Sequence, residues 1–115
     1  MSFEDLLKSL KVDYIAALPN KIAQIKQQIY SADAPALRES FHKFKGTGRT
    51  YGLPEVSVLS EAVERICINT PDLAVVAAGH AVQLLQDIHD ARKAHREYPL
   101  TLDPRFLEIR KLLQS

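Results

Sequence analysis

Residues 41–52 read FHKFKGTGRTYG, and this stretch decides how the rest of the chain is interpreted. Its apolar positions, taken with the turn before it, recur at steps of three and four, the spacing of one buried helical face. These positions are Leu37, Phe41, Phe44, Gly48 and Tyr51. A second set, one residue later, places His42 among the basic residues Arg38, Lys45 and Arg49. The pattern predicts an amphipathic helix whose outer edge presents one histidine in a row of cations.

Glycines interrupt this predicted helix at positions 46 and 48, and each costs about 1 kcal/mol relative to alanine. Because helical side chains lean toward the N-terminus, a side chain at position 46 is expected to lie across the His42 ring, which Gly46 leaves open. Lys45 leans the same way and is expected to bring its ammonium toward the outer ring nitrogen. Gly48 is expected to allow close helix contact. Gly52 suits the left-handed residue that ends a helix.

An exposed imidazole with an open approach and flanking cations is typical of a site that carries a phosphoryl group on histidine. The neutral ring nitrogen is the nucleophile, and Lys45 with Arg38 or Arg49 would screen the incoming charge. Neither a general base nor a metal ligand stands near His42 in the sequence, which indicates a passive acceptor driven by a partner. A lone helical histidine more often has no role, but its combination with Lys45 and Gly46 favours the functional interpretation.

The segment HKFKGT, residues 42–47, with Gly52 ten residues after the histidine, resembles histidine-containing phosphotransfer (HPt) domains. The pattern of that family is His-x-x-Lys-Gly-Ser/Thr/Ala with a later glycine. The following LPEVS, residues 53–57, is similar to members that read Phe-Pro-Glu-apolar-Ser. The resemblance covers about residues 12–95 of the chain.

The resemblance implies that His42 is the phosphorylated residue, that Lys45 is the assisting cation and that Gly46 gives a partner access. The surrounding partner-binding surface is expected to include Arg38, Lys43, Gly46 and Arg49. The implied partners are response-regulator receiver domains, or a hybrid sensor kinase. No cofactor or metal is expected on this chain, because the receiver would contribute Mg²⁺ together with its aspartate.

Two functions remain open at this point. In the first, the chain is a phosphorelay intermediate that accepts a phosphoryl group from one receiver aspartate and passes it to another. Autokinase or nucleotide-binding activity is not expected, because residues 46–48 lie within a helix with no strand before it. In the second, the chain is a non-catalytic binding module that docks on a receiver or sensor kinase and inhibits or scaffolds it. A third possible function, nucleic-acid binding by the helical bundle, is supported only by the row of basic residues around His42.

Composition is typical of one small cytoplasmic domain spanning residues 1–115. The net charge of +1 gives no sign of general affinity for nucleic acid or membrane. No apolar run approaches the roughly 18 residues of a membrane span. The single cysteine, Cys67, excludes an internal disulfide and is expected in the core. His80, His89 and His95 are not spaced for shared metal ligation.

No segment sustains the alternation of a strand, so the prediction is an all-α fold. We expect an antiparallel up-down-up-down four-helix bundle with extra short helices at both ends. A short first helix capped by Ser2 would precede a helix from Val12 to Ile29 that kinks or breaks at Pro19. Pro54 would open the helix after the histidine helix, and Thr70 would cap the next, running to about residue 96.

The predicted core positions follow the helical repeat in each of these segments. They are Phe3, Leu6, Leu7 and Leu10, then Val12, Ile15, Leu18, Ile22, Ile25 and Ile29, then Val56, Leu59, Val63 and Ile66, and finally Leu73, Val76, Ala77, Leu84, Ile88 and Ala91.

Residues 97–115 lie outside the resemblance and form a C-terminal extension. Asp103 and Pro104 predict a last helix over residues 104–113. This helix either caps the bundle or docks a partner or a second copy, and the state of association stays open. Met1 and this extra helix favour a standalone protein rather than part of a larger kinase.

Overall fold

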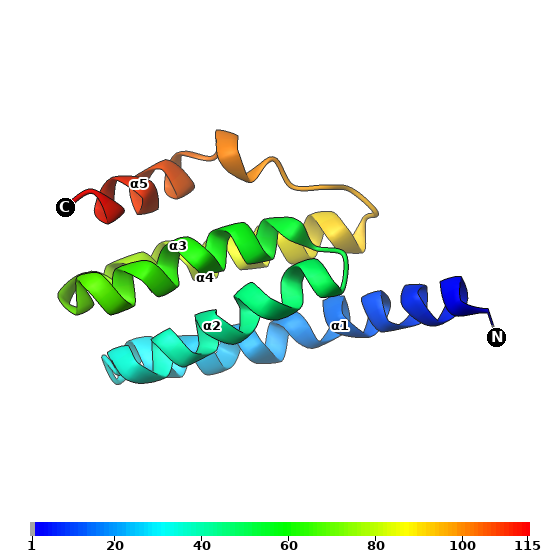
Figure 1. Cartoon of the computed structure of the whole chain (residues 1–115), viewed down its shortest axis with the longest axis horizontal. Coiled ribbons are helices and arrows are strands. Elements are labelled where there is room, and N and C mark those ends of the chain that lie inside the picture. Colours follow the sequence, from blue (N-terminus) through cyan, green and yellow to red (C-terminus); the bar gives the residue numbers. More distant parts are fainter. Residues whose placement is uncertain (1) are drawn as a thin grey trace.

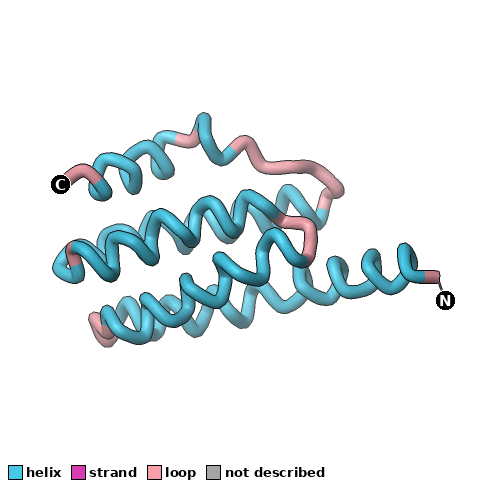
Figure 2. Tube along the Cα trace, in the orientation of Figure 1, coloured by secondary structure: helices cyan, strands magenta, loops and turns pink. Residues whose placement is uncertain are grey.

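The computed structural model describes residues 2–115, and every regular element in that range is helical. The elements are α1 (Phe3–Tyr30), α2 (Ala34–Thr50), α3 (Pro54–Asn69), α4 (Ala74–Lys93) and α5 (Pro104–Leu113), with 3-10 turns at Pro71–Leu73 and Leu100–Leu102. Helices α1 to α4 alternate in direction, and α5 returns along α3 and α4 (Figures 1 and 2). The predicted all-α antiparallel bundle is confirmed.

Helix α1 is one helix of 28 residues, where two had been expected. Ser2 caps it as predicted, since its hydroxyl accepts a hydrogen bond from the backbone N–H of Asp5 at 3.1 Å. The separate short N-terminal helix and the break at Pro19 are both wrong, because the helix continues through Pro19 to Tyr30. Proline removes one backbone hydrogen bond, but buried residues on both sides, such as Leu18 and Ile22, hold the two halves against the same core.

The buried stripe of α1 begins at Tyr14 rather than at the predicted Val12, which is 62% exposed. Farther toward the N-terminus, the large apolar side chains are also exposed; they are Phe3, Leu6, Leu7 and Leu10. The reason is geometric, because the first turns of α1 project beyond the ends of the other helices (Figure 1). The helical pattern was therefore correct there, but no part of the chain lies opposite it.

Helices α2 and α3 lie in close contact at Gly48. A Cβ atom at this position would lie 2.6 Å from Ser57 Oγ, 2.7 Å from Ser57 N and 2.9 Å from Leu53 O. The Ser57 hydroxyl donates to the Lys45 carbonyl at 2.8 Å and accepts from the Arg49 N–H at 2.7 Å. The predicted close contact at Gly48 is confirmed, and Ser57 joins the two helices through the backbone of α2.

The turn after α2 has the form that Gly52 predicted. Gly52 adopts a φ of +85°, and its N–H donates to the Arg49 carbonyl at 3.2 Å. The next N–H, of Leu53, reaches back to the Gly48 carbonyl at 2.8 Å. These two bonds form a Schellman motif, which ends α2 and turns the chain directly into α3.

The start of α4 differs from the prediction. Thr70 makes no side-chain capping bond, Pro71–Leu73 forms a 3-10 turn, and α4 runs only from Ala74 to Lys93. Val76 is exposed, whereas the predicted core positions Ala77, Leu84, Ile88 and Ala91 are buried. The four core positions predicted for α3 are also buried: Val56, Leu59, Val63 and Ile66.

The C-terminal helix α5 packs on α3 and α4 through the buried residues Phe106 and Ile109. Its N-cap Asp103 accepts from the Arg105 N–H at 2.8 Å and also bonds to the Tyr98 hydroxyl. Hydrogen bonds from Arg105, opposed by partial burial, hold the pKa of Asp103 well below its usual range. This packing supports the interpretation of α5 as a helix that caps the bundle.

Replacing Gly48 with alanine is expected to destabilise the fold, because the new methyl group would meet backbone atoms of α3 that have little freedom to move. We expect a loss of about 1–3 kcal/mol in the free energy of unfolding, the usual range for overpacking. Urea denaturation measures it. The matched control is Gly79→Ala in α4, where a Cβ meets no atom within 4 Å and helix propensity alone adds up to about 1 kcal/mol. Equal stability of the two variants would show that the helices do not approach this closely.

Candidate functional site

His42 lies on the outer side of α2, with 68% of its side chain exposed. Its position follows from the helical repeat. Phe41 and Phe44 are both buried, so their side of α2 faces the core and His42 lies on the other side. The structure therefore places the imidazole where the sequence pattern predicted it, on a helix surface open to solvent.

The residue that holds this ring is Glu64 of α3, which sequence reasoning missed. Its Oε2 atom lies 2.5 Å from His42 Nδ1, and its other oxygen, Oε1, accepts from Lys45 Nζ at 2.8 Å. Only 8% of the Glu64 side chain is exposed. The sequence pattern identified no general base beside His42, whereas the fold brings this carboxylate to the ring from twenty-two residues farther along the chain.

Lys45 also differs from the prediction in its contact. The ammonium was expected near the outer nitrogen of the ring, but its hydrogen bond goes to Glu64 instead. One carboxylate thus ties together two side chains from neighbouring turns of α2. Lys45 remains 34% exposed, so its ammonium borders the open surface around His42.

The charge on Glu64 determines which ring nitrogen is available. Burial alone would raise the pKa of Glu64, but hydrogen bonds from Lys45 and His42 outweigh burial and lower the pKa below 4.5. The carboxylate is therefore ionised at neutral pH and can only accept hydrogen bonds. Since His42 Nδ1 faces this acceptor, the proton of the neutral imidazole belongs on Nδ1, which leaves the lone pair on Nε2.

Gly46 leaves open space one turn after the histidine. A Cβ atom at this position would meet nothing within 4 Å, the His42 ring included. We expected any side chain at position 46 to lie across the ring. The methyl group of an alanine at this position would not do so. What Gly46 provides is an uncovered helix surface beside the imidazole.

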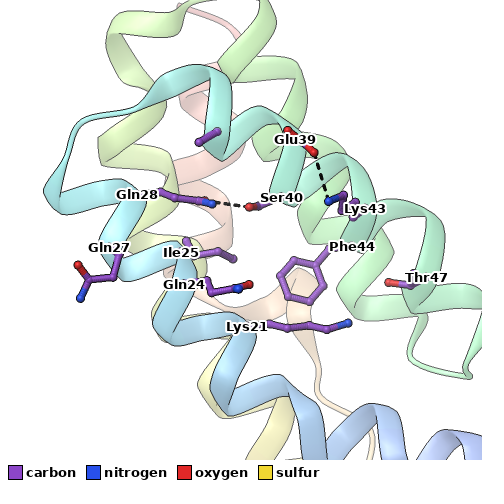
Figure 3. A pocket seen from close by; sticks show the side chains of 11 residues that line it. Lys21, Gln24, Ile25, Gln27, Gln28, Glu39, Ser40, Lys43, Phe44 and Thr47 are labelled. Atoms are coloured by element: carbon purple, nitrogen blue, oxygen red, sulfur yellow. Dashed lines mark hydrogen bonds and ion pairs between the residues drawn. The ribbon is translucent and has the colours of Figure 1, made fainter.

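The remaining predicted site residues lie around this opening. Arg38 and Arg49 are exposed on the same helix. Lys43 lies toward α1, paired with Glu39 at 3.2 Å, and lines a groove between α1 and α2 (Figure 3). Inside this groove, the Ser40 hydroxyl donates to Gln28 Oε1 at 2.8 Å. His42 does not line this groove, and its imidazole is open to solvent.

The other histidines and the cysteine form no comparable site. His80 and His89 are half-buried and His95 is exposed, and among residues 2–115 no group of three His, Cys, Asp or Glu side chains could hold a metal ion. Burial, together with the negative charge of nearby Glu64, raises the pKa of the Cys67 thiol to about 11, which leaves the thiol protonated and unreactive.

An antiparallel four-helix bundle with one exposed histidine on an outer helix is the architecture of a histidine phosphotransfer domain. A sequence model of the Hpt domain matches residues 9–113, so the chain belongs to the Hpt domain family. The family implies a histidine phosphotransfer role in a phosphorelay, as a phosphocarrier, and its members generally interact with receiver domains. The match includes α5, which lies outside the resemblance drawn over residues 12–95.

Neither the curated proteins nor the solved structures contain a significant match to the chain. Along residues 2–115, no helix combines the length and the apolar character that crossing a membrane requires.

The lowered pKa of Glu64 predicts an acid-dependent contribution to stability. Because its folded pKa lies below the ordinary 4.5, the contribution is complete above that pH and is lost as the pH falls through the folded pKa. Glu64→Gln removes the titrating group, so the variant should lose less stability than the wild type between about pH 5 and about pH 3. The measurement is the free energy of unfolding in urea across this range.

Glu61→Gln is the matched control for this experiment, since Glu61 is exposed on the same helix. It should keep the acid dependence of the wild type. An equally steep acid loss in Glu64→Gln and the wild type would mean that the contact with His42 and Lys45 does not form in solution.

Proposed function

We propose that this protein is a phosphorelay intermediate that takes a phosphoryl group from the aspartate of one receiver domain onto His42 and passes it to another receiver. The observation that carries the proposal is the contact between His42 Nδ1 and the buried carboxylate of Glu64. A surface histidine without a role has no need of a buried anion to orient its ring. This ring is oriented so that Nε2 faces outward.

The transfer step follows from that orientation. The Nε2 lone pair attacks the phosphorus of the receiver's aspartyl phosphate, the N–P bond forms, and the P–O bond to the aspartate breaks and releases its carboxylate. The proton on Nδ1 stays in place, so the ring becomes a phosphorylated imidazolium whose positive charge lies against Glu64. In the reverse direction the N–P bond breaks and the ring returns to its neutral form.

Lys45 has two roles in this proposal. Its hydrogen bond fixes the Glu64 carboxylate in position, and its partly exposed ammonium offsets the negative charge of the arriving phosphoryl oxygens. Arg38, Lys43 and Arg49 would contact the receiver around the site, and Gly46 would let its surface approach. The receiver would supply Mg²⁺ and the aspartate, so the chain itself would need no cofactor and no nucleotide.

The exposure of the site agrees with these separate roles of the two proteins. Because 68% of the His42 side chain is open to solvent, the group that reacts with it is best delivered by a second protein rather than held by this one. We place this exchange in the cytoplasm. The alternative of a non-catalytic docking module leaves the contacts of Glu64 with His42 and Lys45 without a use.

Incubation with a phosphorylated receiver domain tests the proposal. The protein should acquire phosphate that is labile in acid and stable in alkali, as expected for phosphohistidine, and His42→Gln should abolish this label. The control is His95→Asn, because His95 is exposed away from the site and asparagine tolerates its φ of +59°. This variant should be labelled like the wild type.

Two results would overturn the proposal. Label that persists in His42→Gln would show that another residue is the acceptor. Receiver binding without any label in the wild type would identify the protein as a docking module instead.

A further inference from the structure

The first turns of α1 leave an apolar stripe without a partner. We call residues 3–12 the overhang, because the N-terminal part of this segment extends past the ends of the other helices (Figure 1). Phe3, Leu7 and Leu10 continue, at steps of four and three, the same stripe that is buried from Tyr14 onward. Phe3 is nevertheless 73% exposed. A core stripe that continues into solvent indicates an interaction surface rather than scattered apolar residues.

A groove lies directly beside the overhang, between α1 and the end of α4. Its apolar part comes from Val12, Ile15, Ala16 and Pro19, and its volume is about 810 Å³. The charged residues that line it are all basic, with Lys8 and Lys11 from α1 and Arg92 and Lys93 from α4. Arg92 is already paired with Glu55, at 2.7 Å, which leaves the lysines available to an incoming anion. The groove therefore fits an occupant that is both apolar and acidic.

The overhang itself has this composition. Its first turn carries Glu4 and Asp5 next to Phe3, Leu6 and Leu7. Its lysines, Lys8 and Lys11, follow one and two turns later. Acidic and basic groups are thus separated along one helix, so two overhangs laid antiparallel would place the acids of each beside the lysines of the other.

We propose that two copies of this chain associate through their overhangs, antiparallel about a twofold axis near residues 7 and 8. In this arrangement Glu4 of one copy meets Lys11 of the other, and the stripe of Phe3, Leu7 and Leu10 packs against the same stripe of the second copy. A twofold axis makes every such contact twice, so a short self-complementary segment is sufficient to define the interface. We expect the contact to bury less than the roughly 1,600 Å² of a standard interface, so the dimer should dissociate on dilution.

The charge pattern favours a second copy over an anionic membrane surface. A helix that binds such a surface carries lysine and arginine along its polar face, whereas Glu4 and Asp5 would be repelled by the lipid headgroups. The C-terminal helix is a weaker candidate, because the apolar residues Phe106 and Ile109 already pack on the bundle.

The dimer leaves the phosphotransfer surface open, and the inference does not depend on the proposed function. The Lys11 side chain lies beside Gly52, at the turn that follows α2. His42 precedes this turn by ten residues, or about 15 Å of helix. Each copy would therefore keep its imidazole accessible.

Charge reversal tests the pairing with two variants of the whole chain, Glu4→Lys/Asp5→Lys and Lys8→Glu/Lys11→Glu. All four residues are exposed, or half-buried in the case of Lys11, and circular dichroism confirms that each variant folds. Sedimentation velocity should show a wild-type mass that rises toward a dimer with concentration. Either variant alone places like charges together and should associate at least about tenfold more weakly. An equimolar mixture should recover association, since one overhang is then wholly basic and the other wholly acidic.

The control variant Lys26→Glu changes an exposed charge on α1 outside the overhang and should dimerise like the wild type. A wild-type protein that stays monomeric up to about 1 mM would overturn the proposal, because even a millimolar Kd would then be visible. A mixture no more associated than its separate components would also overturn it. Binding of monomeric wild type to vesicles of anionic phospholipid would assign the overhang to a lipid surface instead.

Discussion

The close approach of α2 to α3 is the constraint on which both the fold and the site depend. Without a side chain at Gly48, the backbone of α2 comes within contact of Ser57 and Leu53, and the Ser57 hydroxyl then bonds to the backbone on both sides of this point. Two helical turns farther along α3, on the same face, lies Glu64. The contact at Gly48 and Ser57 holds α2 and α3 close together. This closeness lets Glu64 of α3 reach His42 of α2.

The contact with Glu64 fixes the orientation of the His42 ring, although the ring is exposed. A surface imidazole ordinarily rotates and exchanges its proton between two nitrogens, so its nucleophilic atom has no fixed direction. Here a buried carboxylate accepts a hydrogen bond from the Nδ1–H group, while Lys45 donates a hydrogen bond to the second oxygen of that carboxylate. In the proposed function, the fold thus orients the acceptor nitrogen before a partner arrives, and the partner would supply the rest of the chemistry.

Most of the histidine helix could be predicted from its own residues, because the repeat of Phe41 and Phe44 fixes the buried face and thereby the outward direction of His42. The boundary expected at Thr70 is present, since α3 ends at Asn69, although Thr70 makes no side-chain capping bond. The break expected at Pro19 failed for a different reason. Local signals mark where a helix is weak, whereas burial of residues on both sides decides whether the helix continues. The same limit applies to Phe3, Leu6 and Leu7, whose apolar pattern lies on the first turns of α1, beyond the ends of the other helices (Figure 1).

Glu64 was missed because it joins the site across two helices, yet the sequence contained a signal for it. The short turn around Gly52 makes α2 and α3 antiparallel neighbours, so residues at similar distances from that turn lie side by side. His42 precedes Gly52 by ten residues and Glu64 follows it by twelve. A carboxylate adjacent to the core position Val63 at that distance was a candidate partner for the ring.

Nitrogen-15 NMR of the His42 ring tests the central claim most directly, since it distinguishes the two nitrogens before and after phosphorylation. The structure predicts that the proton of the neutral ring is on Nδ1, and that a phosphoryl group is attached to Nε2 with the Nδ1 proton retained. A ring protonated on Nε2, or a phosphoryl group on Nδ1, would contradict the account.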